Sequence, residues 1–333
     1  MAEYKPVVTA TDFDSLERLA GAFGSTKPSK RMLVIVNPYA TTVSDRLKHL
    51  VVYALQGRYQ VDSVETEARG HATELCREAA QEGYDVVCAF GGDGTVNEAA
   101  NGLAGSDTPL TCLPGGSTNV FARILGIPND VVDATEHLLR LADSFEPRPI
   151  DLGVVNDRRF LFTAGIGLDA SVTRRVDARP KLKARFGPWF YSVAAVSAFN
   201  RDYVVKPPRL VADVDGTQIE GVTAMVQNTT PYTYFGRRPI ELAEDVTLDD
   251  GTLAGVVLER ASLIDMPTVT FRALVDSARI VKHRRVAAFS GAAEVTIRSR
   301  DERELPLQVD GDYLGFVPEA RFWADHHALR VVA

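Results

Sequence analysis

The chain has 333 residues, of which 45% are hydrophobic and 24% are charged. This length is enough for two packed cores of ordinary size, and the charged fraction is typical of a globular protein. The net charge of −7 argues against nucleic acid as a partner, because its phosphates repel an acidic molecule.

Residues 1–30 are an N-terminal extension in which apolar residues recur at helical spacing, namely Phe13, Leu16, Leu19, Ala20 and Phe23. The pattern predicts a helix that packs on the main body, on a partner subunit or on a membrane surface.

The sequence shows neither a signal-peptide pattern nor an apolar run of about 18 residues. The three cysteines form no C-x-x-C pair, and their odd number favours a reducing compartment and buried thiols. We therefore expect a cytoplasmic protein.

Residues 31–148 alternate between short apolar runs and amphipathic stretches. The predicted strands are Met32–Val36, Tyr59–Val64, Asp85–Phe90 and Leu110–Leu113, and the predicted helices are His71–Glu82, Val96–Leu103, Thr118–Leu125 and Val131–Leu141. Strands that alternate with helices indicate a doubly wound parallel sheet, which places its ligands at the carboxyl ends of the strands. We expect a nucleotide-binding α/β domain here.

Residues 149–315 carry closely spaced segments rich in Val, Thr and Leu, with turn signals at Asp215-Gly216, Asp250-Gly251 and Asp310-Gly311. These predict an antiparallel, β-rich substrate domain of the sandwich type. Helical stretches are expected at Phe190–Phe199 and Met266–Ile280. Residues 316–333 are expected to return to the first domain, and the active site is expected in the cleft between the two domains.

The densest motif is Gly91-Gly92-Asp93-Gly94-Thr95-Val96-Asn97-Glu98, which follows a strand and opens a helix. Glycines let the backbone approach a phosphate, and the free N–H groups at a helix start face an anion. A carboxylate in such a loop is repelled by phosphate unless a metal lies between them. Asp93 therefore indicates Mg²⁺.

Two further loops follow neighbouring predicted strands. Pro114-Gly115-Gly116-Ser117-Thr118-Asn119 again joins a strand to a helix, and Asn37-Pro38 follows the first strand. Neither the G-x-x-x-x-G-K-[ST] loop nor G-x-G-x-x-G is present at these positions. The three loops predict one phosphate site at the edge of the sheet.

These motifs make the sequence resemble the diacylglycerol kinase catalytic family, in its bacterial soluble branch, which is related to sphingosine and ceramide kinases. The resemblance covers roughly residues 31–333. The G-G-D-G-T-x-N-E signature is intact at Gly91–Glu98, and P-x-G-T-x-N-D-F-A-R appears at Pro114–Arg123 with Ser117 in place of Thr and Val120 in place of Asp. The N-P-x-[SA]-G loop appears as Asn37–Thr41, without its glycine.

The resemblance implies a set of site residues for ATP and Mg²⁺. The implied nucleotide contacts are Asn37, Pro38, Thr66, Gly91, Gly92, Asp93, Gly94, Thr95, Asn97, Glu98, Gly116, Ser117 and Asn119. The family's late D-G-E motif appears as Asp310-Gly311-Asp312; Asp310 is the implied general base, with Asp312 as the competing assignment. Asp151 is linked to the catalytic Mg²⁺, while Asp250, with carbonyls of Thr247 and Thr252, is implied to bind a structural metal.

A basic run followed by aromatic residues lies near the middle of the second domain. Its members are Arg179, Lys181, Lys183, Arg185, Trp189 and Phe190. Cations beside aromatic rings favour a membrane interface with anionic headgroups. A solvated loop is the alternative, and His326-His327 is interpreted as a surface or strand-end pair.

Together these features predict an ATP- and Mg²⁺-dependent lipid kinase that forms phosphatidate from diacylglycerol at the inner face of the membrane, in phospholipid biosynthesis. A kinase of a sphingoid base or ceramide, an NAD kinase-like enzyme and a catalytically inactive nucleotide-binding regulator are the alternatives. The sequence decides neither the lipid nor whether the chain is a monomer or a homodimer, and it leaves the role of the extension open.

Overall fold

The computed structural model describes the chain except for residues 1–9, 24–29, 178–208, 263, 276–277 and 302. The chain divides into two compact units. The N-terminal unit extends to Ile150 and resumes at His327–Ala333, and the C-terminal unit consists of Asp151–His326.

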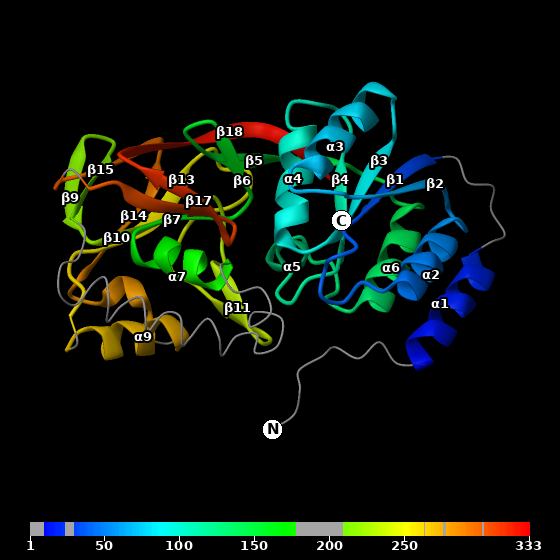
Figure 1. The fold of residues 1–333 in the computed structure, drawn as a ribbon, viewed down its shortest axis with the longest axis horizontal. Coiled ribbons are helices and arrows are strands. Elements are labelled where there is room, and N and C mark those ends of the chain that lie inside the picture. Colours follow the sequence, from blue (N-terminus) through cyan, green and yellow to red (C-terminus); the bar gives the residue numbers. More distant parts are fainter. Residues whose placement is uncertain (1–9, 24–29, 178–208, 263, 276–277, 302) are drawn as a thin grey trace. The chain divides into compact units, whose positions relative to one another are not determined.

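The N-terminal unit is built on four parallel strands in the order β2-β1-β3-β4. Their bounds are β1 (Lys30–Val36), β2 (Tyr59–Glu65), β3 (Val86–Gly91) and β4 (Leu110–Pro114). The helices are α1 (Ala10–Phe23), α2 (Asp45–Leu55), α3 (His71–Gln81), α4 (Asp93–Leu103), α5 (Val120–Ile124) and α6 (Val131–Leu141). Figure 1 shows α3 and α4 on one face of these strands and α1, α2 and α6 on the other. The predicted doubly wound α/β fold is confirmed.

Strand β3 is buried along its whole length, as expected for a central strand covered on both faces. The thiols of Cys76, Cys88 and Cys112 are also buried, and burial raises the pKa of Cys76 to about 12. The expectation that the cysteines are core residues is therefore confirmed.

Helix α2 has no counterpart among the predicted elements. Ser44 caps its start, with its hydroxyl accepting a hydrogen bond from the N–H of Leu47. Leu47, Val51 and Leu55 are fully buried at the i, i+4, i+8 spacing of one helical face. Ala54 is buried beside them, so a local apolar pattern marks the buried face of this helix.

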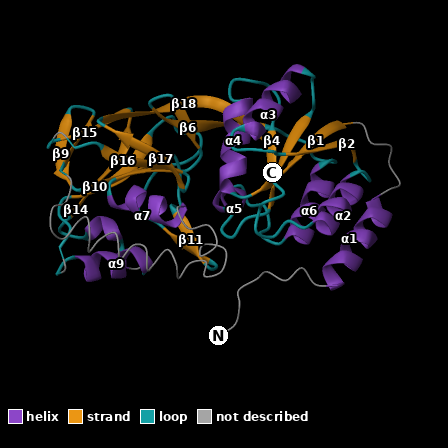
Figure 2. Cartoon of the chain, in the orientation of Figure 1, coloured by secondary structure: helices purple, strands orange, loops and turns teal. Residues whose placement is uncertain are grey.

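Most strands of the C-terminal unit form two antiparallel sheets, seen as the dense group of strands in Figure 2. One sheet has the order β14-β13-β10-β7-β16-β17 and comprises β7 (Thr163–Ile166), β10 (Thr223–Gln227), β13 (Leu253–Leu258), β14 (Val286–Ala292), β16 (Leu305–Val309) and β17 (Asp312–Val317). The other has the order β18-β15-β8-β9 and comprises β8 (Leu210–Val214), β9 (Thr217–Gly221), β15 (Glu294–Ser299) and β18 (Glu319–Val331), with β5 (Arg148–Val155) pairing β18 and β6 (Arg158–Phe160).

Side chains from both sheets form one buried cluster, so the sheets pack face to face as a sandwich. Phe160 of β6 and Phe322 of β18 meet edge to face there, with ring centroids 6.5 Å apart. The remaining elements are β11 (Thr233–Phe235), β12 (Arg238–Ile240), α7 (Leu168–Asp177), α9 (Met266–Leu274) and the short helix η3 (Ile280–Lys282). The predicted antiparallel β domain is confirmed.

Strand β18 belongs to both units. It starts in the C-terminal unit, where it pairs with β15, and its end enters the parallel sheet, where Val331 is paired with Leu110 of β4. Within the strand, His327 has a positive φ of 54°, a conformation that non-glycine residues adopt rarely.

Candidate active site

The first glycine loop joins β3 to α4 in the N-terminal unit. A Cβ atom on Gly91 would lie 2.6 Å from Oγ1 of Thr95, so only glycine fits at this position. Gly92 is the N-cap of α4, and its carbonyl accepts hydrogen bonds from the N–H groups of Thr95 and Val96. The N–H groups of Thr95 and Val96 are thereby used within the helix, so an anion would meet those of Asp93 and Gly94, the first two residues of α4.

The second loop packs directly against the first, backbone to backbone. The N–H of Gly115 donates to the carbonyl of Gly91 at 2.8 Å, and a Cβ atom on Gly116 would lie 2.8 Å from Cα of Gly92. Asn119, in the left-handed region with φ 48°, closes the loop by accepting the N–H of Gly116 and donating to its carbonyl. The two loops predicted from the sequence therefore lie side by side, at the ends of neighbouring strands.

The close approach of the two loops predicts a strong effect of a single methyl group. Gly116→Ala is expected to lower the free energy of unfolding by about 1–3 kcal/mol, because the added methyl group would meet a backbone atom, Cα of Gly92, and one of the loops would have to shift. Gly21→Ala in α1 is the control, since nothing lies within 4 Å of its added methyl group, and it is expected to be neutral or slightly stabilising. Equal urea midpoints for both variants would contradict the packing.

Asp93 links the two loops through its side chain. Its Oδ1 accepts a hydrogen bond of 3.0 Å from the N–H of Phe121, at the start of α5. The carboxylate is half-buried in the first turn of α4. One carboxylate thus stands among the N–H groups of both loops.

The ends of β1 and β2 complete the same edge of the sheet. Asn37 donates from Nδ2 to Oγ1 of Thr95 at 3.0 Å, and its own N–H donates to the carbonyl of Phe90. Thr66, at the end of β2, is nearly buried and donates its N–H to the carbonyl of Val36. Pro38 follows Asn37 in the turn. The structure therefore brings Asn37 and Thr95 into contact and places Thr66 at the end of the adjoining strand.

Two of the implied nucleotide residues make hydrogen bonds with their surroundings, and a third is exposed. Asn97 is buried within α4 and accepts a hydrogen bond from Asn101, one turn later. Oε1 of Glu98 accepts the N–H of Gly70, at the start of α3, at 2.8 Å. Ser117 is exposed at the tip of the second loop. Asn97 and Glu98 thus position α4 against its surroundings.

In the C-terminal unit, Asp310 lies in the tight turn between β16 and β17. Its carboxylate accepts three backbone N–H groups, from Leu161 at 2.7 Å, Phe162 at 3.0 Å and Thr163 at 3.1 Å. The side chain is only 6% exposed, and the backbone has a positive φ of 47°. Asp310 therefore holds the segment that leads into β7.

A second Asp-Gly turn in the same unit uses the same arrangement. Asp215, between β8 and β9, also has a φ of 47°, and its carboxylate accepts the N–H groups of Ala293 and Glu294. This turn joins two strands of a sandwich and carries none of the kinase motifs. The comparison shows that an Asp-Gly turn can serve as a structural clamp in this fold.

Asp312 has a different environment from Asp310. It is half-buried as the first residue of β17, paired with Val309 of β16. The strand continues into Leu314 and Phe316, whose side chains are exposed. A carboxylate is thus followed by apolar surface.

The turn implied to bind a structural metal is held by hydrogen bonds. Oδ2 of Asp250 accepts from the N–H and hydroxyl of Thr247, and Oδ1 accepts from the N–H and hydroxyl of Thr252. Burial acts to raise the pKa of Asp250, but these four bonds outweigh it and the pKa is lowered. The carboxylate of Asp250 thus joins Thr247 to Thr252, and its assignment as a ligand of a structural metal stays a prediction.

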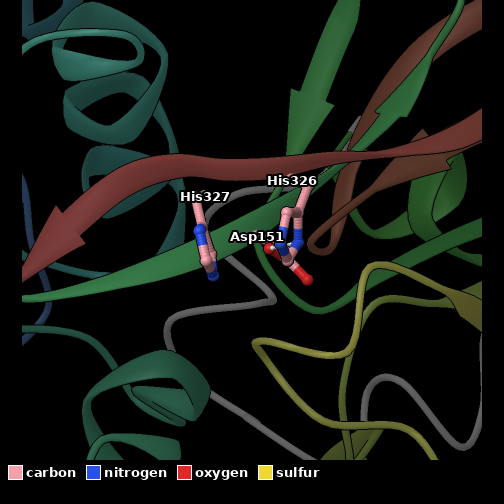
Figure 3. A group of neighbouring side chains, drawn as sticks. All are labelled: Asp151, His326 and His327. Atoms are coloured by element: carbon pink, nitrogen blue, oxygen red, sulfur yellow. Dashed lines mark ion pairs between the residues drawn. The ribbon is translucent and has the colours of Figure 1, made fainter.

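Asp151 is buried, and its oxygens have partners. Oδ2 accepts the N–H of Gly251 at 2.7 Å, and Oδ1 is 2.8 Å from Nδ1 of His326, as Figure 3 shows. His326 and His327 are exposed, as the surface interpretation expected. The contact between His326 and Asp151 could not be predicted from the sequence, because no local pattern connects two residues so far apart in the chain.

The basic and aromatic residues assigned to the membrane, Arg179, Lys181, Lys183, Arg185, Trp189 and Phe190, lie outside the described residues. In the part of the chain that the structure describes, no helix is both long and apolar enough to cross a bilayer.

Comparison with known families matches both parts of the chain. Residues 31–155 match the diacylglycerol kinase catalytic domain, and residues 163–333 match the YegS C-terminal NAD kinase beta sandwich-like domain. The first match contains all three loops of the N-terminal unit, and the second contains the Asp310-Gly311-Asp312 turn.

Individual relatives extend over most of the chain. It is 31% identical to a diacylglycerol kinase of Bacillus subtilis over 87% of this chain and 92% of the relative, and 29% identical to one of Staphylococcus aureus over 87% and 88%. A crystal structure of a diacylglycerol kinase from Bacillus anthracis superposes with a TM-score of 0.68 at 25% identity, covering 92% of this chain and 98% of that one.

Proposed function

Since this chain belongs to the diacylglycerol kinase family and is a phosphotransferase with an alcohol acceptor, we propose that it transfers the γ-phosphate of ATP, with Mg²⁺, to the hydroxyl of diacylglycerol and so forms phosphatidate. The observation that carries the proposal is the contact between the two glycine loops. Their backbones touch at Gly91–Gly115 and Gly92–Gly116, which gathers N–H groups and one carboxylate at the ends of β3 and β4.

This arrangement suits a nucleoside triphosphate with its metal. Backbone N–H groups at the start of α4 would bind phosphate oxygens, and the helix dipole favours the negative charge. The carboxylate of Asp93, in the same turn, offers the hard oxygen that Mg²⁺ prefers. When bound, Mg²⁺ neutralises the charge that develops on the transferring phosphoryl group.

Asp312 is the proposed general base. The acceptor is an alcohol, so a neighbouring group must take its proton as the new phosphorus–oxygen bond forms. Asp310 is poorly suited to this task, because three backbone N–H groups already use its carboxylate oxygens. Asp312 lies two residues later and is more exposed, and the family motif has a carboxylate at its position too.

A lipid acceptor agrees with the surface that follows Asp312. Leu314 and Phe316 are 43% and 47% exposed and lie two residues apart, on the same face of β17. Such a surface suits acyl chains or the glycerol backbone better than the ribose of a dinucleotide. Diacylglycerol is the preferred acceptor because the curated relatives named above are diacylglycerol kinases.

The lipid would be presented at the inner face of the membrane, and the basic run at residues 179–185 is the proposed contact. Reversing the charges of Arg179, Lys181 and Lys183 is expected to weaken binding to anionic vesicles by 10-fold or more, since each basic residue near such a surface contributes about 1 kcal/mol. Turnover of a short-chain, water-soluble diacylglycerol should be unchanged. Vesicle cosedimentation equal to the parent protein would contradict the proposed contact.

A lipid panel with labelled ATP tests the function. Purified protein is incubated with Mg²⁺ and dispersed diacylglycerol, a sphingoid base, ceramide or NAD, and labelled products are separated. Labelled phosphatidate as the main product is the expected result. If a sphingoid base, ceramide or NAD is labelled instead, that compound and not diacylglycerol is the acceptor. ATP binding without any transfer would indicate an inactive nucleotide-binding regulator.

A further inference from the structure

Three potential metal ligands meet on strands β5 and β18, which are hydrogen-bonded to each other. One ligand atom each of Asp151, His326 and His327 lies within 4.8 Å of the other two. In the part of the chain that the structure describes, no other group of three His, Cys, Asp or Glu residues does so. Figure 3 shows the three side chains on the same side of the β18 strand.

Two neighbouring residues of a regular strand point to opposite faces. His327 departs from this rule through its left-handed backbone, with φ 54°, which lets both imidazoles project to one side. For a residue other than glycine this conformation is unfavourable, because Cβ comes close to the following carbonyl oxygen. Such strain persists where the surrounding structure imposes it, and it is concentrated at functional positions.

The carboxylate of the group is fixed before any ion arrives. Asp151 is 1% exposed, and the N–H of Gly251 holds Oδ2 at 2.7 Å while Oδ1 lies 2.8 Å from Nδ1 of His326. A hydrogen bond to a ligand from a neighbouring group, such as the one from Gly251, orients the ligand and increases its affinity for the metal. Both histidines are exposed, so their rings can adjust and water can fill the remaining positions.

From these contacts we infer that Asp151, His326 and His327 form a binding site for a divalent transition metal of the Zn²⁺ and Co²⁺ class. Two imidazoles and one carboxylate are the ligands that Zn²⁺, Co²⁺ and Fe²⁺ take in proteins with open positions for water. Mg²⁺ prefers oxygen ligands in octahedral geometry and competes weakly for such a site. The ion would tie β5 to β18, and on this inference Asp151 binds this ion instead of the Mg²⁺ that the family resemblance implies for it.

Co²⁺ is the probe, because its visible absorption reports the coordination directly. Untagged full-length protein is titrated with Co²⁺ alone, in 10-fold excess of Mg²⁺, and with Zn²⁺ as competitor. The expected result is one equivalent of Co²⁺ that Zn²⁺ displaces and Mg²⁺ does not. His327→Ala removes one ligand while keeping the Asp151–His326 pair, and it should weaken Co²⁺ binding at least about tenfold.

His49→Ala is the matched control, since it removes an exposed imidazole from α2, far along the chain from the three ligands. It should bind Co²⁺ as the parent protein does. The inference is overturned if the parent protein binds no stoichiometric Co²⁺, if His327→Ala binds it equally well, or if Mg²⁺ displaces it. Kinase activity is not the readout, so failure here leaves the proposed lipid kinase function untouched.

Discussion

Replacing Asp93 by asparagine or by alanine is expected to lower kcat by at least about 10³-fold, while the protein stays folded. The reason is the position of the carboxylate, in the first turn of α4 among the N–H groups of two phosphate loops. Without this carboxylate the protein would lose a ligand of the Mg²⁺ that neutralises charge on the reacting phosphoryl group. Loss of that metal removes several kcal/mol of transition-state stabilisation.

The two substitutions separate the charge of Asp93 from its hydrogen bond. Asparagine keeps an oxygen that can accept the N–H of Phe121, so the tie between the loops should survive. Alanine loses it, at an expected cost of about 1 kcal/mol in the free energy of unfolding. Both variants should nevertheless be equally inactive.

Steady-state kinetics at saturating Mg²⁺ and urea unfolding measure the two effects. Asp107→Ala, an exposed acidic residue after α4, is the control and should retain full activity. Near-parental turnover by Asp93→Asn would show that Asp93 serves only to join the loops, and the Mg²⁺ ligand would have to be another residue.

The sequence could predict the arrangement of residues that lie within one short motif. Each glycine loop directly follows its strand, so parallel strand order alone brings Gly91 and Gly115 together at one edge of the sheet. Because a Cβ atom does not fit at these positions, the residues must be glycine, and glycines are recognisable in the sequence. The fold class followed from the same periodicity, because alternation of strands and helices is a local pattern.

Contacts between distant segments could not be predicted in this way. The three N–H donors of Asp310 come from residues 161–163, and the partner of Asp151 comes from β18. Helix α2 was missed although its pattern is local, since Ser44 at the N-cap and Leu47, Val51 and Leu55 at helical spacing mark it in the sequence. The family resemblance implied a role for Asp310 without the contacts that occupy its carboxylate.

The second prediction with a large effect compares Asp312 with Asp310, whose carboxylate is occupied by those contacts. Asp312→Asn is expected to lower kcat by about 10²–10⁴-fold with little change in the affinity for ATP, the usual range for loss of a general base. Asparagine keeps the shape of the side chain but does not take up the proton of the acceptor hydroxyl. The free energy of unfolding should change little, because Asp312 is half-buried at the start of a strand.

Asp310→Asn should instead lower the free energy of unfolding more than it lowers kcat. Its new amide group would face one or more of the N–H groups of Leu161, Phe162 and Thr163, which need an acceptor. A buried donor left without an acceptor costs about 1–3 kcal/mol. The variant should therefore unfold at lower urea, while the kcat of the folded fraction falls much less than in Asp312→Asn.

Asp215→Asn is the matched control for this pair, because Asp215 makes the same kind of Asp-Gly turn with two backbone N–H donors. It should lose some stability and no kcat. If Asp310→Asn instead loses activity at unchanged stability while Asp312→Asn remains active, Asp310 is the base after all. In that case the N–H groups that now hold its carboxylate would have to release it when substrate binds, and protection of the amides of residues 161–163 from hydrogen exchange should fall in the presence of ATP and lipid.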